Sequence, residues 1–327
     1  MSNSVSYPPT LRPPVSGAAI ASMILGILSI VLFCMGPLFG IPALICGHVA
    51  LAHLKNYPQI SGKGMAIAGT VMGYVSIGVM AFYLLLGTFF VSEAEKMELK
   101  RIAKLELVEP EDAEFHVILP KGHDPGKPVS VAVWLHGYGW NPSDLTLFEE
   151  AYQARADKIG VAFVGISATA ARDEGGFEWA ESSKVDRDYI RSVFEANSDK
   201  IIPQWPRVVL FGFSQGAKVA GDVASNYPGE FAGAILMSPG GENSYTDVPG
   251  FGEDAHEWQT YYCLVGADED YGNVSLTSSY VTDLEFLDAK VIHKEYEGVE
   301  DHTMPPDFDE KLSEWIETIL SVEEEAE

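Results

Sequence analysis

The stretch Gly212-Phe213-Ser214-Gln215-Gly216 stands between an apolar run, Arg207–Phe211, and a helical stretch, Ala217–Ser225. A sharp turn from a strand into a helix lifts a serine hydroxyl above the carboxyl end of the strand. Glycines on both sides remove Cβ atoms that would clash in so tight a turn, and the helix N-terminus offers N–H groups to a developing oxyanion. The stretch therefore predicts a nucleophilic Ser214 at the edge of a sheet.

Apolar runs alternate with helical stretches on both sides of this motif. The helical stretches include Lys184–Glu195 and, at the end of the chain, Phe308–Leu320. The central runs are mostly apolar, as expected of strands that helices cover on both faces. The pattern predicts an α/β fold with a mostly parallel central sheet. The predicted strands are Glu114–Leu119, Ser130–Leu135, Val161–Ile166, Arg207–Phe211, Ala232–Met237, Thr260–Val265 and Lys290–Tyr296.

A serine nucleophile needs a base, and three histidines follow Ser214 in the chain: His256, His293 and His302. His293 lies inside a predicted strand, and His256 lies in an acidic loop before another. His302 follows the last predicted strand and a turn, and it precedes the last helix. In folds with the order serine, acid, histidine, the base occupies that place. We therefore predict His302 as the base.

The acid that orients the base should follow the strand Thr260–Val265. The turn there reads Gly266-Ala267-Asp268-Glu269-Asp270, so three carboxylates compete. Asp270 precedes the turn-like Tyr271-Gly272-Asn273, whereas Asp268 is nearer the strand end. We rank Asp270 slightly ahead of Asp268 and place Glu269 third. The carboxylates that do not act are expected to be solvated loop charges.

A second oxyanion donor should come from the loop after an early strand. The sequence Val133-Trp134-Leu135-His136-Gly137-Tyr138-Gly139-Trp140 has this form, an apolar strand followed by His-Gly and a glycine-containing turn. The predicted donors are the backbone N–H groups of Tyr138 and Gln215. We expect His136 to be structural rather than catalytic.

Charge divides the chain into two parts. Residues 1–92 contain no Asp or Glu, whereas residues 93–327 hold 47 acidic and 18 basic residues, a formal charge of −29. This charge excludes binding to phosphate backbones, and so to nucleic acids, and it excludes adsorption to anionic lipid through charge. The sequence shows no Cys/His cluster with metal-ligand spacing and no phosphate-binding loop, so we expect no metal and no cofactor.

The acid-free part predicts membrane attachment. The segment Gly64–Val91 is long enough for one span. The segment before it is ambiguous: Ala18–Met35 is long enough to cross, but Gly36-Pro37 and Pro42 follow it. We favour one span plus a broken or interfacial helix there over two full crossings. Small residues at a spacing of four, such as Ser22 with Gly26 and Gly69 with Gly73, suit close helix packing.

The predicted organisation has four parts. They are a disordered tail at 1–16, a membrane module with two spans at 17–92, a linker helix at 93–111 and the catalytic domain at 112–327. With two spans, the tail and the catalytic domain share one side of the membrane, and basic residues weakly favour the cytoplasmic side.

Two family resemblances follow from these motifs. The stretches "ASMILGILSI", "GHVALAHLK" and "GKGMAIAGTVMGYV" resemble the two-span DUF4190 modules, which implies membrane attachment. The stretches "LHGYG", "GFSQG", "GADED" and "YEGVEDH" resemble α/β-hydrolases of the esterase/phospholipase–carboxylesterase and dienelactone-hydrolase type. That resemblance implies hydrolysis of esters or thioesters without a metal or organic cofactor. The usual Gly-x-x-Asp spacing of that type lands on Glu269 here, which leaves the identity of the acid open.

The predicted function is a membrane-anchored serine hydrolase that acts on small-molecule esters or thioesters through an acyl-enzyme. A serine peptidase could use the same residues, and a non-catalytic binding domain could keep the same fold. Only about 21 residues separate Met237 from Thr260, too few for a large lid domain. The site should therefore be open, with Pro239-Gly240-Gly241 at its rim; Phe177 and Trp179 either line a pocket or pack in the core.

Overall fold

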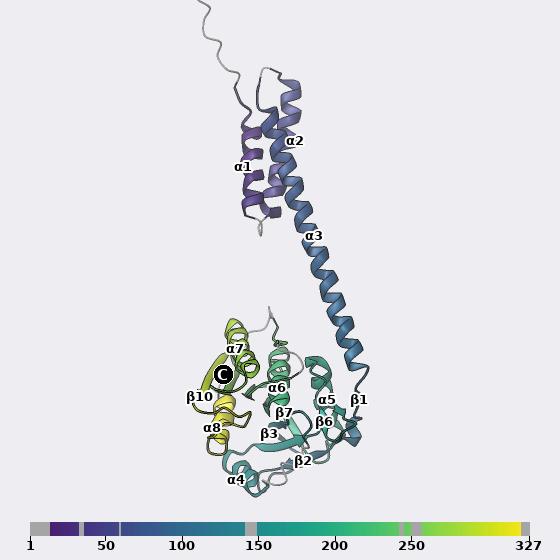
Figure 1. Ribbon diagram of the computed structural model, residues 1–327, viewed down its shortest axis with the longest axis vertical. Coiled ribbons are helices and arrows are strands. Elements are labelled where there is room, and N and C mark those ends of the chain that lie inside the picture. Colours follow the sequence, from purple (N-terminus) through teal and green to yellow (C-terminus); the bar gives the residue numbers. More distant parts are fainter. Residues whose placement is uncertain are drawn as a thin grey trace, which may run out of the picture. The chain divides into compact units, whose positions relative to one another are not determined.

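The computed structural model describes residues 14–32, 36–58, 60–140, 149–241, 245–249 and 257–321, and the chain forms two units, Met1–Leu99 and Lys100–Glu327 (Figure 1). The boundary between the units falls inside helix α3 (Lys63–Ile102). The segment 93–111, expected as a linker, is therefore divided, since its residues from Lys100 onward belong to the second unit. Most of the expected disordered tail lies outside the described residues.

The first unit consists of helices α1 (Gly17–Val31), α2 (Gly36–Asn56) and α3. Small residues bring the helices together. A Cβ atom on Gly69 of α3 would collide with the backbone of Ser22 on α1, and one on Gly73 would lie 2.8 Å from the carbonyl oxygen of Gly40 on α2. The Ser22 hydroxyl donates to the carbonyl oxygen of Ala43, 2.8 Å away. Small residues thus permit the backbone contacts of this bundle.

Two helical segments of this unit are long and apolar enough to cross a membrane, Leu38–Asn56 and Lys63–Leu86. The first of them differs from the sequence expectation, which placed the crossing at Ala18–Met35 and a break at Pro42. Helix α1 ends at Val31 and has only 15 residues. Helix α2 continues through Pro42, which lies in its second turn and costs a single intrahelical hydrogen bond.

The second unit is built on a seven-stranded sheet in the order β10-β9-β8-β7-β3-β4-β2. All neighbouring strands pair in parallel except β2, which pairs antiparallel with β4 at one edge. Each of the seven predicted strands is present in this sheet. The strands are β2 (Phe115–Ile118), β3 (Pro128–Leu135), β4 (Ala162–Ile166), β7 (Ile202–Phe213), β8 (Gly233–Met237), β9 (Thr260–Gly266) and β10 (Lys290–Tyr296).

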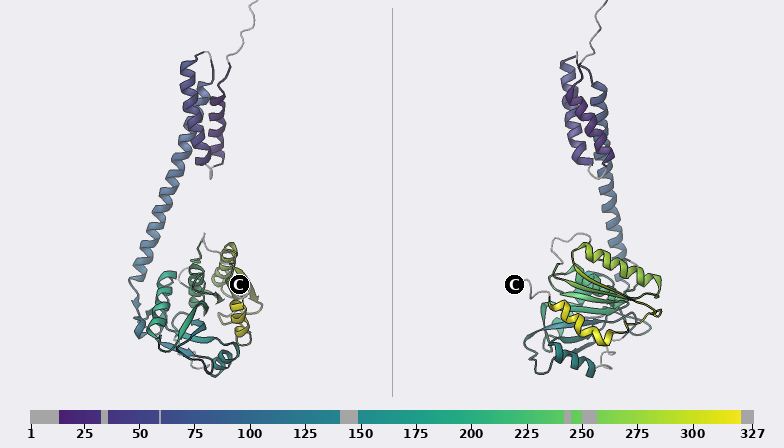
Figure 2. Two further views of the ribbon diagram at one scale, coloured as in Figure 1. Left: turned by 180° about the vertical axis from the view of Figure 1, so that it is seen from behind. Right: turned by 90° about the vertical axis from the view of Figure 1, so that its left-hand side faces the viewer.

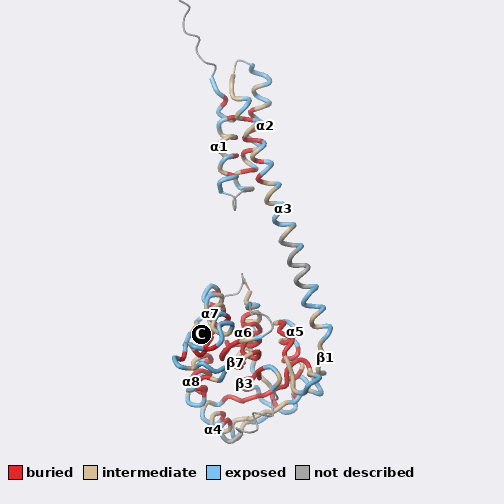
Figure 3. The backbone as a smooth tube through the Cα atoms, in the orientation of Figure 1, coloured by how far each residue is buried: buried red, intermediate tan, exposed pale blue. Residues whose placement is uncertain are grey.

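Helices cover both faces of this sheet, as Figure 2 shows. One core packs α5, α6 and α7 against one face, and a second core packs α4 and α8 against the other. Successive strand residues alternate between the two cores: Val133 faces the first and Trp134 the second. Strands β3, β4, β8 and β9 are accordingly buried along most of their length, whereas the edge strands β2 and β10 are only partly buried (Figure 3). The helices are α4 (Glu149–Ile159), α5 (Ser183–Ala196), α6 (Gln215–Asn226), α7 (Tyr271–Phe286) and α8 (Phe308–Ser321).

A small antiparallel sheet joins the start of the second unit to the loop after β4. Its order is β1-β5-β6, with β1 (Glu106–Leu107), β5 (Ala170–Ala171) and β6 (Phe177–Glu178). The Val108 N–H also donates to the Thr169 carbonyl, 2.9 Å away, and a short 3-10 helix, Pro110–Asp112, leads into β2. The sequence did not predict this sheet, because two-residue strands leave no periodic pattern.

Candidate active site

Ser214 occupies a strained turn between strand β7 and helix α6. Its backbone angles are φ 56° and ψ −122°, a conformation that is costly for a residue with a Cβ atom. The Ser214 N–H donates to the Met237 carbonyl at 3.0 Å, and its own carbonyl accepts from the Gly240 N–H at 3.1 Å. These bonds hold the serine at the carboxyl ends of β7 and β8, as the motif predicts.

Helix α6 begins very close to the end of strand β3. A Cβ atom on Gly216 would collide with the Leu135 carbonyl oxygen, so only glycine fits there. A Cβ atom on Gly137 would lie 3.3 Å from the Cβ atom of Ser214. The His-Gly turn after β3 and the serine turn therefore lie side by side, which is the arrangement that two oxyanion donors require.

His136 holds the turn after β3 in place. It is fully buried; its Nδ1 donates to the Gly137 carbonyl at 2.7 Å, and its Nε2 accepts from the Ala168 N–H at 3.0 Å. Burial lowers the pKa of His136 to about 4, although the bond to Gly137 opposes that shift. Both ring nitrogens of this neutral imidazole are engaged in hydrogen bonds, so neither is available for proton transfer. The geometry therefore assigns His136 a structural role.

The predicted oxyanion donors lie on these two turns. Among the described residues, neither the Tyr138 N–H nor the Gln215 N–H donates to a backbone carbonyl. Gln215 is the first residue of α6, where a backbone N–H has no partner within the helix. Both groups are therefore available to a substrate oxygen.

His302 lies beside the serine turn and bonds to Glu269. Its Nδ1 is 3.0 Å from Glu269 Oε2. Its ring packs on Phe213, the residue before the serine, with centroids 4.6 Å apart. The His302 side chain is 39% exposed while the Glu269 side chain is fully buried, so the imidazole has a protected side toward the acid and an open side toward solvent.

Glu269 accepts four hydrogen bonds in all. The other donors are the Ser238 hydroxyl at 2.5 Å, the Gly266 N–H at 3.0 Å and the Asn273 amide at 3.2 Å. Burial alone would raise the pKa of Glu269, but these bonds and the one from His302 outweigh burial and hold the pKa below its usual value. Glu269 is therefore a buried carboxylate that stays ionised.

The structure brings neither Asp270 nor Asp268 against His302. Asp270 is the N-cap of helix α7, where its Oδ1 accepts from the Gly272 N–H at 2.8 Å. Asp268 Oδ2 accepts from the Gly298 N–H at 3.1 Å in the neighbouring turn. Both carboxylates accept from local backbone groups, whereas Glu269, which we rank third from the sequence, is the carboxylate that contacts His302.

Asn273 is a site residue that the sequence reasoning missed. Its Nδ2 lies 2.8 Å from His302 Nδ1 and 3.2 Å from Glu269 Oε2. A Cβ atom on Gly240 would lie 3.1 Å from Asn273 Oδ1 and 3.8 Å from Ser214 Oγ, so this amide lies between the serine turn and the base. The sequence does contain a signal for Asn273. Aspartate is a favoured N-cap, so Asp270 predicts a helix that begins at Tyr271, and Asn273 then lies one helical turn after Glu269.

The other residues considered for the site lie elsewhere. His293 is on strand β10, 3.6 Å from Glu295, and His256 lies outside the described residues. Trp179 is buried, and its Nε1 donates to the His136 carbonyl at 2.9 Å, so it packs behind the site. Within the described ranges no group of three His, Cys, Asp or Glu side chains could hold a metal ion.

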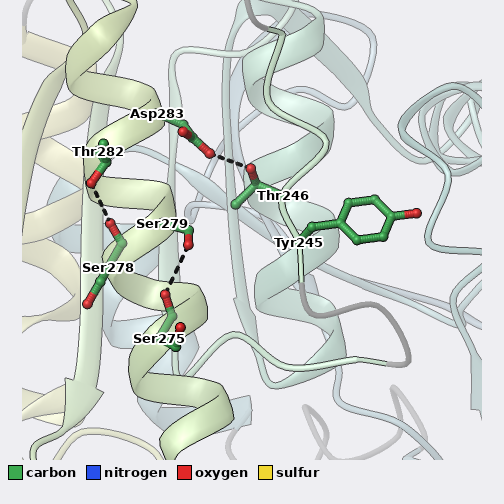
Figure 4. Close-up of a pocket in the computed structure, with 7 residues that line it drawn as sticks. All are labelled: Tyr245, Thr246, Ser275, Ser278, Ser279, Thr282 and Asp283. Atoms are coloured by element: carbon green, nitrogen blue, oxygen red, sulfur yellow. Dashed lines mark hydrogen bonds between the residues drawn. The ribbon is translucent and has the colours of Figure 1, made fainter. Parts of the chain in front are cut away.

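A hollow of about 400 Å³ lies along helix α7, away from these residues (Figure 4). Its hydroxyl groups are engaged locally: Ser279 and Thr282 donate to carbonyls of their own helix, and Thr246 donates to Asp283 at 2.5 Å. None of the site residues contributes to it, so it does not locate the substrate. It is lined by Tyr245, Thr246, Ser275, Ser278, Ser279, Thr282 and Asp283.

A strained serine between a strand and a helix, a histidine on a buried glutamate and two free backbone donors define a serine hydrolase of the α/β-hydrolase fold. The chain belongs to the Esterase family, whose model, described as "Putative esterase", matches residues 109–282. It is thus an ester-cleaving hydrolase. Residues 18–83 match a domain of unknown function, DUF4190.

One solved structure, esterase PE8, agrees with this fold, and a second is matched over much of its length. Esterase PE8 is 18% identical, with a TM-score of 0.50 over 64% of this chain and 99% of that chain. The carboxylesterase of Bacillus cereus is 19% identical, with a TM-score of 0.47 over 63% of this chain and 94% of that chain. No curated protein matches the chain in sequence.

Proposed function

We propose that this protein is a membrane-anchored serine hydrolase that cleaves carboxylic esters or thioesters through Ser214, His302 and Glu269. The hydrogen bond between His302 Nδ1 and Glu269 Oε2, beside the serine turn, carries this proposal. An ionised, buried carboxylate attracts the proton of the imidazole, and a hydrogen bond to a charged acceptor is stronger than one to a neutral group. The Glu269 carboxylate therefore keeps the proton of His302 on Nδ1, and Nε2 is left without a proton and can accept one.

The reaction has two steps on these residues. In the first, His302 Nε2 takes the Ser214 proton as the hydroxyl oxygen attacks the carbonyl carbon. The protonated imidazole then passes that proton to the departing alcohol or thiol, and an acyl-serine remains. In the second step, His302 takes a proton from water as the water oxygen attacks the acyl-serine. The imidazolium then returns that proton to Ser214 Oγ as the bond between Oγ and the acyl carbon breaks, which releases the carboxylic acid and restores the free serine. Glu269 stabilises the imidazolium in both steps.

The developing oxyanion is stabilised by the backbone N–H groups of Tyr138 and Gln215. Preorganised donors need no rearrangement as charge develops, and removing one such donor costs about 3 kcal/mol of transition-state stabilisation. The chain sets this geometry through the Gly137 and Gly216 contacts described above, because they bring the two turns within reach of one oxygen atom.

The proposed activity predicts turnover of simple activated substrates. The full chain in detergent should hydrolyse p-nitrophenyl esters and acyl thioesters, and a fluorophosphonate probe should modify Ser214. A panel of acyl chain lengths measured by kcat/KM then identifies the preferred acyl group. Hydrolysis of peptide amides in preference to every ester would favour a peptidase, and a chain that neither turns over esters nor reacts with the probe would contradict the proposal.

We also infer that the N-terminal unit anchors the enzyme in a lipid bilayer. Support comes from two helical segments of sufficient length, Leu38–Asn56 and Lys63–Leu86. Apolar side chains of the unit are exposed along both helices, among them Ile45, Val71 and Phe82. Contact with lipid tails removes such surface from water, whereas the acidic second unit has no attraction to anionic lipid. The cytoplasmic orientation of the catalytic unit stays a proposal on the distribution of basic residues.

Membrane attachment should resist salt. Because apolar insertion is not screened by ions, the full chain should remain in the membrane fraction after a high-salt wash and enter solution only with detergent. A chain that begins at Glu93 retains the second unit whole and should be soluble and hydrolyse the same esters. Release of the full chain by salt alone would contradict insertion. Loss of activity in the well-folded shorter chain would show that the N-terminal unit shapes the site.

A further inference from the structure

Glu181 is a buried residue in a strained conformation next to the site. It is 6% exposed, and its φ of 49° lies in the left-handed region that residues with a Cβ atom rarely adopt. Such strain persists only where the surrounding structure fixes the backbone. Strained residues of this kind gather at functional sites.

Contacts on both sides of Glu181 fix its backbone. Asp186, fully buried on helix α5, accepts from the N–H groups of Ala180 at 3.0 Å and Ser182 at 3.1 Å. Arg101 donates to the carbonyl of Ala180 and, at 3.3 Å, to the carbonyl of Glu181. Burial raises the pKa of Asp186 to about 6, against the hydrogen bonds that it accepts. The turn is thus held by one buried acid and one arginine.

The side chain of Glu181 points to the residue that follows the nucleophile. Its Oε1 accepts from Gln215 Nε2 at 2.9 Å, and Gln215 Oε1 accepts from the Trp179 N–H at 3.0 Å. A Cβ atom on Gly241 would lie 2.6 Å from Glu181 Oε1, so the carboxylate also packs against the rim loop after β8. Glu181 therefore lies between the start of α6 and the rim.

We propose that Glu181 is a positioning residue for the oxyanion donor at Gln215, and that Arg101, from a segment expected to be a linker, belongs to the catalytic unit because it holds Glu181. The proposal rests on the proposed function, in which the Gln215 N–H stabilises the oxyanion. Fixing both ends of the Gln215 amide fixes the first residue of α6, and with it the direction of its backbone N–H. A donor is effective only when its nitrogen lies about 2.7–3.1 Å from the developing oxyanion, so small shifts of the turn weaken it.

Residues next to Arg101 support the second donor as well. Lys104, Leu105 and Glu106 line a hollow of about 260 Å³ together with Tyr138 and Arg172. The Arg172 guanidinium lies over the Tyr138 ring, 4.1 Å from its centroid. Strand β1 begins at Glu106 and pairs with β5, whose last residue, Ala171, immediately precedes Arg172. The segment from Arg101 to Leu107 therefore contacts Glu181 at one end and borders the hollow beside Tyr138 at the other.

The test compares three variants of Glu181 in the full chain. Glu181→Ala removes the acceptor, and Glu181→Gly removes it while accepting the positive φ without strain. Both should lower kcat about 10- to 100-fold with KM within about threefold, because an oxyanion donor acts in the transition state. Glu181→Gln keeps an oxygen that can accept from Gln215, so it should stay within about threefold of the parent kcat.

Three results would overturn the proposal. They are parental kcat in both Glu181→Ala and Glu181→Gly, a loss in Glu181→Gln as large as in Glu181→Ala, or a rise in KM at constant kcat. The last two would indicate, respectively, a role of the charge and a role in substrate binding. If the parent chain itself fails to react with a fluorophosphonate probe, the proposed function fails, whereas equal reaction of parent and Glu181→Gly removes only the positioning role.

Two further comparisons test whether Glu181, Gln215 and Arg101 act together. Gln215→Leu keeps the backbone N–H but breaks the side-chain bonds, so its effect and that of Glu181→Ala should be far from additive in the double variant. Arg101→Ala should lower kcat in the same direction, while Lys100→Ala, its exposed neighbour, should leave kcat unchanged. Additive effects at Glu181 and Gln215, or equal effects at Arg101 and Lys100, would contradict the assignment.

Discussion

Replacing Ser214 with alanine should abolish esterase activity and leave the fold intact. In serine hydrolases the loss of the nucleophile lowers kcat by about 10⁶-fold, since histidine and acid have no function without it. The backbone of Ser214 is held by Met237 and Gly240, whose bonds do not involve the hydroxyl. The measurement is kcat/KM on a p-nitrophenyl ester with fluorophosphonate labelling of the same sample.

A second substitution at position 214 should show that the strained backbone of the turn lowers the stability of the fold. Ser214→Gly removes the Cβ atom that a φ of 56° disfavours, so it should be inactive yet more stable than Ser214→Ala by about 1 kcal/mol. For a unit of this size that is a rise of roughly 2–4 °C in the midpoint of thermal unfolding. Residual labelling of either variant at the parental level would remove Ser214 from the mechanism.

The sequence predicts the sheet well because its central strands are apolar on both faces. Buried strands such as Val161–Ile166 read as continuous apolar runs, and all seven predicted runs pair in one sheet. The serine turn and His302 follow from the same logic, because the ends of parallel strands meet at one edge. A pattern of residues fixes which loops meet there, and the loops that carry Ser214, Tyr138 and His302 do lie together. The catalytic roles of these residues and of Gln215 stay predictions.

The choice among the three carboxylates could not be made from residue type and order alone. Asp268, Glu269 and Asp270 are consecutive, so their direction depends on the path of a single turn. The start of α7 decides that path. Because Asp270 caps the helix, Glu269 is turned inward under Ser238, and a glutamate has the additional methylene needed to reach His302. If Tyr271-Gly272-Asn273 is taken as a turn, the N-cap role of Asp270 is hidden, and only the Gly-x-x-Asp spacing of the resembled family points to Glu269.

The membrane unit shows a similar limit. Pro42 predicts a break between segments, but helix α2 begins at Gly36 and continues through that proline. Which apolar stretch forms the long helix is then decided by packing, where Gly40 meets Gly73 and Ser22 meets Gly69. Such contacts depend on pairs of residues about 30 to 50 positions apart, which a local pattern does not relate.

Replacing Glu269 with glutamine should lower kcat by about 10⁴-fold, as expected when the acid partner of a catalytic histidine is made neutral. Glutamine fills the same space and can still accept from the Ser238 hydroxyl, so the fold should persist. Its amide, however, can donate to His302 Nδ1. That bond favours the tautomer with the proton on Nε2, which cannot take the Ser214 proton.

Asn273 should make this effect larger. Its Nδ2 lies 2.8 Å from His302 Nδ1, and in the parent protein the carboxylate of Glu269 competes for the same amide. Once the carboxylate is gone, both neighbouring amides can donate to Nδ1, and both stabilise the inactive tautomer. The imidazole also loses the charge that stabilises its protonated form in the transition state.

The neighbouring aspartates are the matched controls for Glu269. Asp270→Asn keeps a good N-cap on α7, and Asp268→Asn keeps an oxygen for the Gly298 N–H, so both should retain kcat within about threefold of the parent. The measurement is kcat for the three variants on one ester, with the thermal midpoint of each as the check on folding. If Asp270→Asn or Asp268→Asn loses activity and Glu269→Gln does not, the acid is the aspartate and the bond between Glu269 and His302 is only structural.

The three variants change adjacent residues by the same chemistry, and of the three carboxylates only Glu269 contacts His302. A loss confined to Glu269→Gln would therefore come from that contact and not from the local charge of the turn.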